Sequence, residues 1–119
     1  MTRLDAPVLV AVSEDPETSH RAAEAIRIAL GILAGENRLV LVLLGPGAKV
    51  LDAAAEEYVD GQELLRHLGT LRRLGQRFHV ERGAIPPTPD WNPLAVEVVP
   101  IEPPDLARLL ADSRRALMF

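Results

Sequence analysis

The chain has 119 residues, of which 48% are hydrophobic and 25% charged, with a formal net charge of −4 and no cysteine. Length and composition predict a single globular domain over residues 1–119 and exclude a disordered tail or a disulfide-stapled miniprotein. The lack of thiols excludes cysteine nucleophiles, thiolate metal sites and persulfide carriers. The acidic charge and the 3% aromatic content argue against nucleic acid as a partner.

Nothing in the sequence has the hydropathy of a targeting or membrane segment. The N-terminal residues lack the hydrophobic run of a signal peptide. The longest apolar stretches are far shorter than the ~20 residues that a membrane-spanning helix needs. We therefore expect a cytoplasmic protein without a membrane partner.

The first part of the chain alternates aliphatic runs with an amphipathic segment. Residues 7–12 and 39–44 are continuous apolar runs, typical of strands buried on both faces of a parallel sheet. Between them, Asp15 is a favourable N-cap and Pro16 suits the first helical position. A helix is therefore predicted from this point to about Ala34.

Two further helices and a third strand are predicted in the middle of the chain. The turn Gly45-Pro46-Gly47 ends the second strand, and helices are expected over about 49–59 and 62–74. Residues 77–82 then form a strand that is less apolar than the first two. It is expected to be half exposed.

The segment 83–93 holds four prolines and the only tryptophan, so no helix can form there. A strand at 94–99, a helix at 103–112 and a final strand at 116–119 follow. The proline-rich connection either crosses the sheet in extended form or leaves the fourth strand antiparallel, and we favour the crossover. The alternation predicts an α/β fold, a three-layer α/β/α sandwich with a mainly parallel five-stranded sheet.

Ligands of open α/β sheets bind beyond the carboxyl ends of the strands. In this chain, the loops expected at that edge of the sheet are rich in acidic residues and contain few cationic ones. The candidate ligand-binding residues there are Ser13, Glu14, Asp15, Gly45, Gly47, His79, Glu81 and Arg82. Glycine-rich phosphate motifs are absent, and no histidine spacing matches a metal site. We therefore assign no catalytic residue, metal or cofactor.

Trp91 is the most informative aromatic residue, because Asp90, Asn92 and prolines surround it in the sequence. This setting is not that of an ordinary core strand. The indole either fills a gap beneath its own loop or anchors a contact with another subunit, a role in which tryptophan is enriched. Trp91 is therefore the candidate interface residue.

Several stretches together follow a known order of strands and helices. They are residues 8–12 leading into Glu14-Asp15-Pro16-Glu17, residues 39–45, and the closing segments 105–112 and 115–119. With these stretches the chain resembles the DsrE/DsrF-like family over nearly its full length. The resemblance implies a layered α/β/α domain that assembles as a homo-oligomer or with related subunits.

In the sulfur-relay members of that family, a cysteine after the third strand carries a persulfide. The corresponding region here reads Phe78-His79-Val80-Glu81-Arg82-Gly83-Ala84-Ile85 and has no cysteine. The resemblance thus implies a non-catalytic interaction or regulatory subunit, linked to sulfur-relay complexes. The alternative is a small-ligand-binding or catalytic domain that uses the acidic edge of the sheet.

Overall fold

The computed structural model describes residues 5–119; residues 1–4 of the predicted domain lie outside this part. Its helices and strands are, in chain order, β1 (Val8–Val12), α1 (Arg21–Ala34), β2 (Leu39–Leu43), α2 (Gly61–Arg73), β3 (Arg77–Glu81), β4 (Glu97–Ile101), α3 (Pro103–Asp112) and β5 (Arg115–Met118). Three 3-10 helices lie in the connections: η2 (Gly45–Leu51), η3 (Ala55–Glu57) and η4 (Arg82–Ala84). Over the described range, none of the helices has the length and apolar character needed to cross a bilayer.

All five strands lie in one parallel sheet in the order β4-β3-β2-β1-β5. The sequence left the direction of β4 open. In the structure β4 runs parallel to β3, with Phe78 opposite Val98 and Val80 opposite Pro100. The favoured crossover is therefore confirmed, and the predicted α/β fold class with it.

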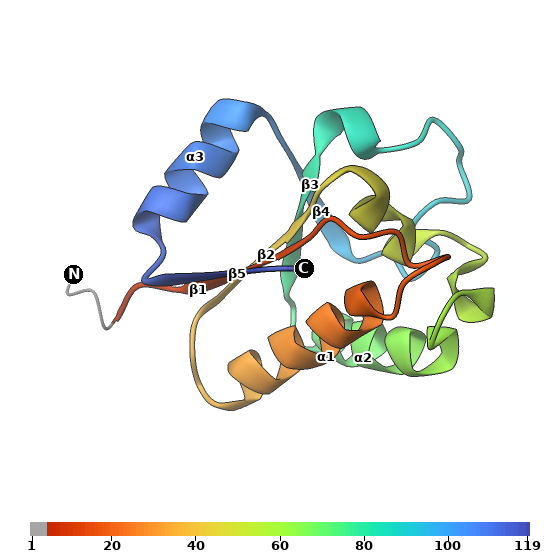
Figure 1. Ribbon diagram of the computed structural model, residues 1–119, viewed down its shortest axis with the longest axis horizontal. Helices are drawn as coiled ribbons and strands as arrows, with labels where there is room; N and C mark the ends of the chain where they lie inside the picture. The colour runs from red at the N-terminus through yellow and green to blue at the C-terminus, as the bar shows by residue number, and fades with distance from the viewer. Residues whose placement is uncertain (1–4) are drawn as a thin grey trace.

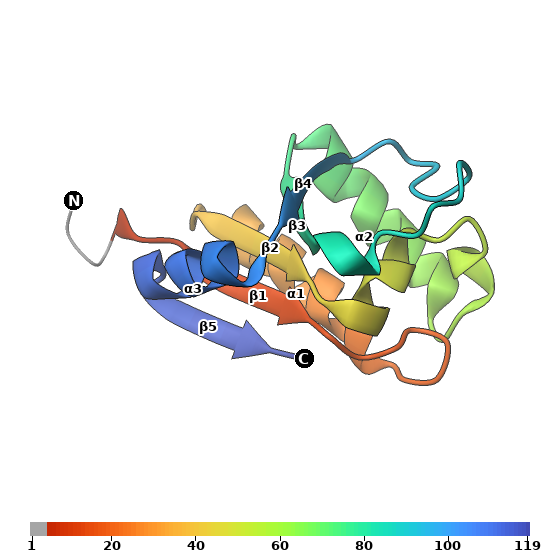
Figure 2. The same cartoon turned by 90° about the horizontal axis from the view of Figure 1, so that it is seen from above.

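The two faces of the sheet are covered unequally (Figures 1 and 2). Strands β1 to β4 are added in one direction, so right-handed crossovers place their connections, including α1 and α2, on one face. Only the return from β4 to β5 brings a helix, α3, to the other face. The larger core lies beneath α1 and α2, and the smaller core beneath α3 contains the buried residues Leu9, Ala11, Val42 and Ile101.

Helix α1 begins at Arg21 and not at Pro16 as predicted. Asp15 does not cap this helix, because its Oδ1 accepts the backbone N–H of Glu17 at 2.9 Å and holds a separate turn. The Oγ of Ser19 accepts the N–H of Arg21 at 3.1 Å, at the point where the helix starts. The sequence prediction therefore placed the N-cap of this helix about one turn too early.

The predicted helix over 49–59 is wrong. The chain forms the two 3-10 helices η2 and η3, separated at Asp52, whose ψ of 150° is extended. Strand β4 also starts later than predicted, at Glu97. The residues before it form a loop in which Asn92 and Ala95 have positive φ angles of 61° and 56°.

Candidate functional site at the strand ends

The loop that follows β1 is hydrogen-bonded to Phe119, the residue after β5. Ser13 donates its backbone N–H and its hydroxyl to the carbonyl oxygen of Phe119, at 2.7 and 3.0 Å. The N–H of Glu14 donates to the same oxygen at 3.3 Å. The loop is thereby tied to the edge strand β5, and these donors already have an acceptor within the chain.

An ion-pair cluster joins this loop to η2. The Nζ of Lys49 lies 3.1 Å from Oδ2 of Asp15 and 3.0 Å from Oε1 of Glu17. The N–H of Glu17, followed by Lys49, lowers the pKa of Asp15. The carboxylates of Glu17 and Asp15 in turn raise the pKa of Lys49. The one lysine of the chain is thus held by two acidic side chains.

The glycine turn after β2 serves close packing. A Cβ on Gly47 would lie 2.0 Å from the carbonyl oxygen of Val12, so η2 packs directly against the end of β1. Gly45 has a φ of 48°, which favours glycine. Its N–H donates to Oε1 of Glu81 at 2.8 Å. Glu81 therefore links the ends of β2 and β3.

The remaining two candidate residues lie apart from this cluster. Arg82 pairs with Glu102 at the start of α3, with 2.7 Å between Nε and Oε1. His79 lies in the middle of β3, where its Nδ1–H donates to the carbonyl oxygen of Leu41 at 3.3 Å. Burial lowers the pKa of His79.

His79 lines a groove of about 330 Å³ between the β3–β4 side of the sheet and α3. Val99 and Ile101 of β4 and Leu109 of α3 form its apolar part. Glu14 and Asp15 do not line this groove. The structure therefore gathers the predicted acidic residues at the strand ends but does not bring His79 to them.

A second cavity of about 330 Å³ opens between the η2–η3 segment and the proline-rich loop. Its lining residues are Asp52, Ala53, Ala54, Tyr58, Pro86, Thr88, Asp90 and Trp91. Sequence reasoning missed Asp52 and Tyr58, because they lay in a segment interpreted as one amphipathic helix. One feature of the sequence could have indicated this cavity: the only tyrosine and the only tryptophan both lie in connections that follow strands.

Trp91 lines this cavity and also holds its loop in place. Its Nε1–H donates to the carbonyl oxygen of Ala48 at 3.2 Å, and the half-buried ring packs against the larger core. The indole thus supports its own loop, which was one of the two alternatives. A role of Trp91 in subunit contacts stays a prediction.

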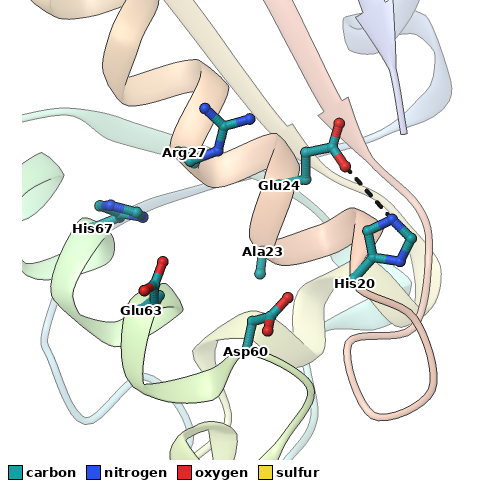
Figure 3. A pocket seen from close by; sticks show the side chains of 7 residues that line it. All are labelled: His20, Ala23, Glu24, Arg27, Asp60, Glu63 and His67. Atoms are coloured by element: carbon teal, nitrogen blue, oxygen red, sulfur yellow. Dashed lines mark ion pairs between the residues drawn. The ribbon is translucent and has the colours of Figure 1, made fainter.

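A third hollow lies between the start of α1 and the first turns of α2 (Figure 3). It measures about 190 Å³ and is lined by His20, Ala23, Glu24, Arg27, Asp60, Glu63 and His67. His20 and Glu24 lie 3.6 Å apart, and Nδ1 of His67 is buried without a hydrogen-bond partner. Within residues 5–119, however, no three potential metal ligands lie close enough together to hold an ion.

Comparisons with known proteins relate the chain to a protein family and to solved structures. The sequence model of the DsrE/DsrF-like family matches residues 6–119. The crystal structure of the YchN protein from E. coli is similar, with a TM-score of 0.74 and 16% sequence identity. The alignment covers 96% of this chain and 99% of YchN. Comparison with curated protein sequences gave no significant match.

Proposed function

The chain belongs to the DsrE/DsrF-like family, and on that premise we propose that it is a non-catalytic member acting as an interaction or regulatory subunit of an oligomer. The sulfur-relay members that it resembles carry a persulfide on a cysteine after the third strand. Here Glu81, Arg82 and Gly83 occupy that region, and the whole chain lacks cysteine. No side chain of this protein can therefore form the sulfur–sulfur bond of a persulfide. In a sulfur-relay complex, this subunit would act beside relatives that carry the cysteine.

The observation that carries this proposal is the incomplete burial of α3. The helix has a leucine-rich stripe, yet none of its residues is buried. Leu106 and Leu109 contact the smaller core, whereas Leu110 is 37% exposed. An amphipathic helix in a domain normally buries its apolar stripe against another layer. Part of the apolar surface of α3 is therefore left exposed, and a partner could cover it.

The neighbouring edge strand extends the same surface. Met118 of β5 pairs in register with Ala11, so it faces the α3 side of the sheet, and it is 54% exposed. Three of the four residues of β5 are exposed, and an open edge strand offers backbone groups for pairing. We call Leu110, Met118 and the free edge of β5 the α3–β5 surface. A second copy of the chain or a related subunit would cover it.

The experiment that tests this proposal is light scattering on the purified protein. We expect a mass larger than that of the monomer for the wild type and a smaller mass for Met118→Glu, because a buried glutamate would lack a partner. Leu74→Glu is the matched control, since Leu74 is 58% exposed at the end of α2, outside the α3–β5 surface. A wild-type monomer at all concentrations would overturn self-assembly of the chain through this surface.

A second measurement tests the absence of sulfur transfer. The protein is incubated with a small-molecule persulfide donor, and its intact mass is recorded before and after thiol reduction. We expect no added sulfur, because no thiol is present to accept it. A reducible gain of sulfur would contradict the non-catalytic assignment even if the protein is oligomeric.

A further inference from the structure

The chain has one tryptophan and one tyrosine, and both line the same cavity at the carboxyl edge of the sheet. Its volume of about 330 Å³ lies within the range of small-molecule sites. This edge is also where open α/β sheets bind their ligands. Aromatic residues are scarce in this protein, so the presence of two of them in the lining gives this cavity a distinct chemical character.

The charge of the cavity is negative. Asp52 and Asp90 line it together with the neutral side chain of Thr88, and no lysine, arginine or histidine is among the lining residues. Lys49 forms ion pairs with Asp15 and Glu17 elsewhere at the edge and not with these two aspartates. Among the described residues, no cationic side chain forms an ion pair with Asp52 or Asp90.

A hydrogen bond fixes the side chains of Tyr58 and Asp52 relative to each other. The hydroxyl of Tyr58 donates to Oδ2 of Asp52 at 2.8 Å. Burial, and then the neighbouring carboxylate of Asp52, raise the pKa of Tyr58, so it remains a neutral donor. The side chain of Asp52 is therefore fixed beside an uncharged aromatic ring.

The opposite wall is also held in place before any ligand binds. Besides the bond from the Trp91 ring to Ala48, the N–H of Asn92 donates to the carbonyl oxygen of Leu51 at 2.8 Å. The side-chain amide of Asn92 forms bonds of 3.0 and 3.1 Å with the backbone of Val96. Two walls that are already ordered lose little conformational entropy when a ligand enters.

We infer that this cavity binds a small organic cation of the alkylammonium class, held by the rings of Tyr58 and Trp91 and the carboxylates of Asp52 and Asp90. Aromatic rings attract cations through their electron-rich faces, and tryptophan does so most strongly. A quaternary ammonium group has no hydrogen to donate, so aromatic carbon and nearby negative charge suit it better than a ring of hydrogen-bond acceptors. An anion would be repelled by both aspartates.

The site is separate from the α3–β5 surface. The proline-rich loop and η2 lie at one end of the molecule, and α3 with β5 lies toward the other in both views (Figures 1 and 2). The inference therefore does not rest on the proposed assembly. A monomeric protein could still bind the cation, and an oligomer could fail to bind it.

Trp91 makes the test direct, because it is the only tryptophan and reports on its own cavity. The full chain is titrated with choline while tryptophan fluorescence is followed, and the Nε1–H signal of Trp91 is monitored by NMR. The matched ligand is 3,3-dimethylbutan-1-ol, which has the shape of choline without its charge. We expect a saturable change with choline, with a dissociation constant of about 1 mM or lower, and a response at least severalfold weaker with the alcohol.

Single substitutions then locate the binding site. Asp90→Asn and Asp52→Asn each remove one negative charge from the lining, and each should weaken choline binding roughly three- to tenfold. Glu57→Gln is the control, because this exposed glutamate lies nearby on η3 but does not line the cavity. Asp90 is exposed and forms no ion pair within the described chain, so its variant should fold normally even if Asp52→Asn does not.

The outcomes separate the inference from its alternatives. Equal responses to choline and the alcohol would show an apolar hollow that does not recognise charge, and would overturn it. No saturable response to choline would overturn it as well. An unchanged affinity in Asp90→Asn and in a folded Asp52→Asn would place the cation elsewhere and also contradict it.

Discussion

Gly47 approaches the end of β1 so closely that an added Cβ would lie 2.0 Å from the carbonyl oxygen of Val12. That oxygen also accepts the N–H of Leu44 at 2.8 Å, so it cannot retreat without weakening the connection between β1 and β2. We predict that Gly47→Ala lowers the free energy of unfolding by about 1–3 kcal/mol. Urea denaturation followed by circular dichroism measures this change.

Gly83 provides the matched control for that substitution. A Cβ at this position would meet no atom within 4 Å, and the backbone does not have a positive φ. Gly83→Ala should therefore be neutral or stabilise the protein by up to about 1 kcal/mol, since alanine restricts the unfolded chain. Equal losses in the two variants would contradict the packing role of Gly47.

Ala95 is strained in the loop that leads into β4. Its φ of 56° is in the left-handed region, which costs a residue with a Cβ roughly 1–2 kcal/mol. Glycine adopts this conformation freely but loses more entropy on folding, so the net gain is smaller than the strain. We predict that Ala95→Gly raises the free energy of unfolding by about 0.5–1 kcal/mol, measured by urea denaturation.

Ala54→Gly is the control for Ala95→Gly. Ala54 is also exposed, but its φ of −88° is ordinary for alanine. The same substitution there adds unfolded-state entropy without relieving strain, so it should destabilise the protein by about 0.5–1 kcal/mol. If both variants shift stability in the same direction, the strain at Ala95 does not control the effect.

The strands of this fold could be predicted because each of the first two is a continuous apolar run. Val8–Val12 is buried along its whole length, which only a central strand of a parallel sheet requires. The segment 49–59 was predicted as one helix because Val50, Ala54 and Tyr58 have helical spacing. In the structure these residues instead belong to a segment of two 3-10 helices, which the extended backbone of Asp52 separates.

The candidate site was only partly accessible to sequence reasoning. The rule for parallel sheets located the acidic edge, but it could not tell that Lys49 pairs with Asp15, 34 residues away. Likewise, nothing in the sequence fixes how the loop of Trp91 lies against the segment of Tyr58. Contacts between two connections depend on their tertiary packing, and no periodic pattern encodes them.

His79 gives a prediction for the pH dependence of stability. Burial is the main cause of its lowered pKa, and Arg77 lowers it further, whereas Leu41 and Glu97 oppose the shift. Asp105, Arg108 and Asp112 of α3 line the same groove. Between the lowered folded pKa and the unfolded value of ~6.5, the unfolded chain binds more protons than the folded one. The contribution of His79 therefore makes the protein less stable as the pH falls through this window.

We expect the urea midpoint of the wild type to fall between about pH 7 and 5 more steeply than that of His79→Gln, which cannot titrate at this position. Carboxylates titrate in both proteins, so the difference between the two slopes isolates the imidazole. An NMR titration of the His79 ring should give a midpoint below that of a histidine-containing model peptide in the same buffer. A midpoint at or above the peptide value would show that the favourable contacts with Leu41 and Glu97 outweigh burial, and the two urea slopes would then coincide or reverse.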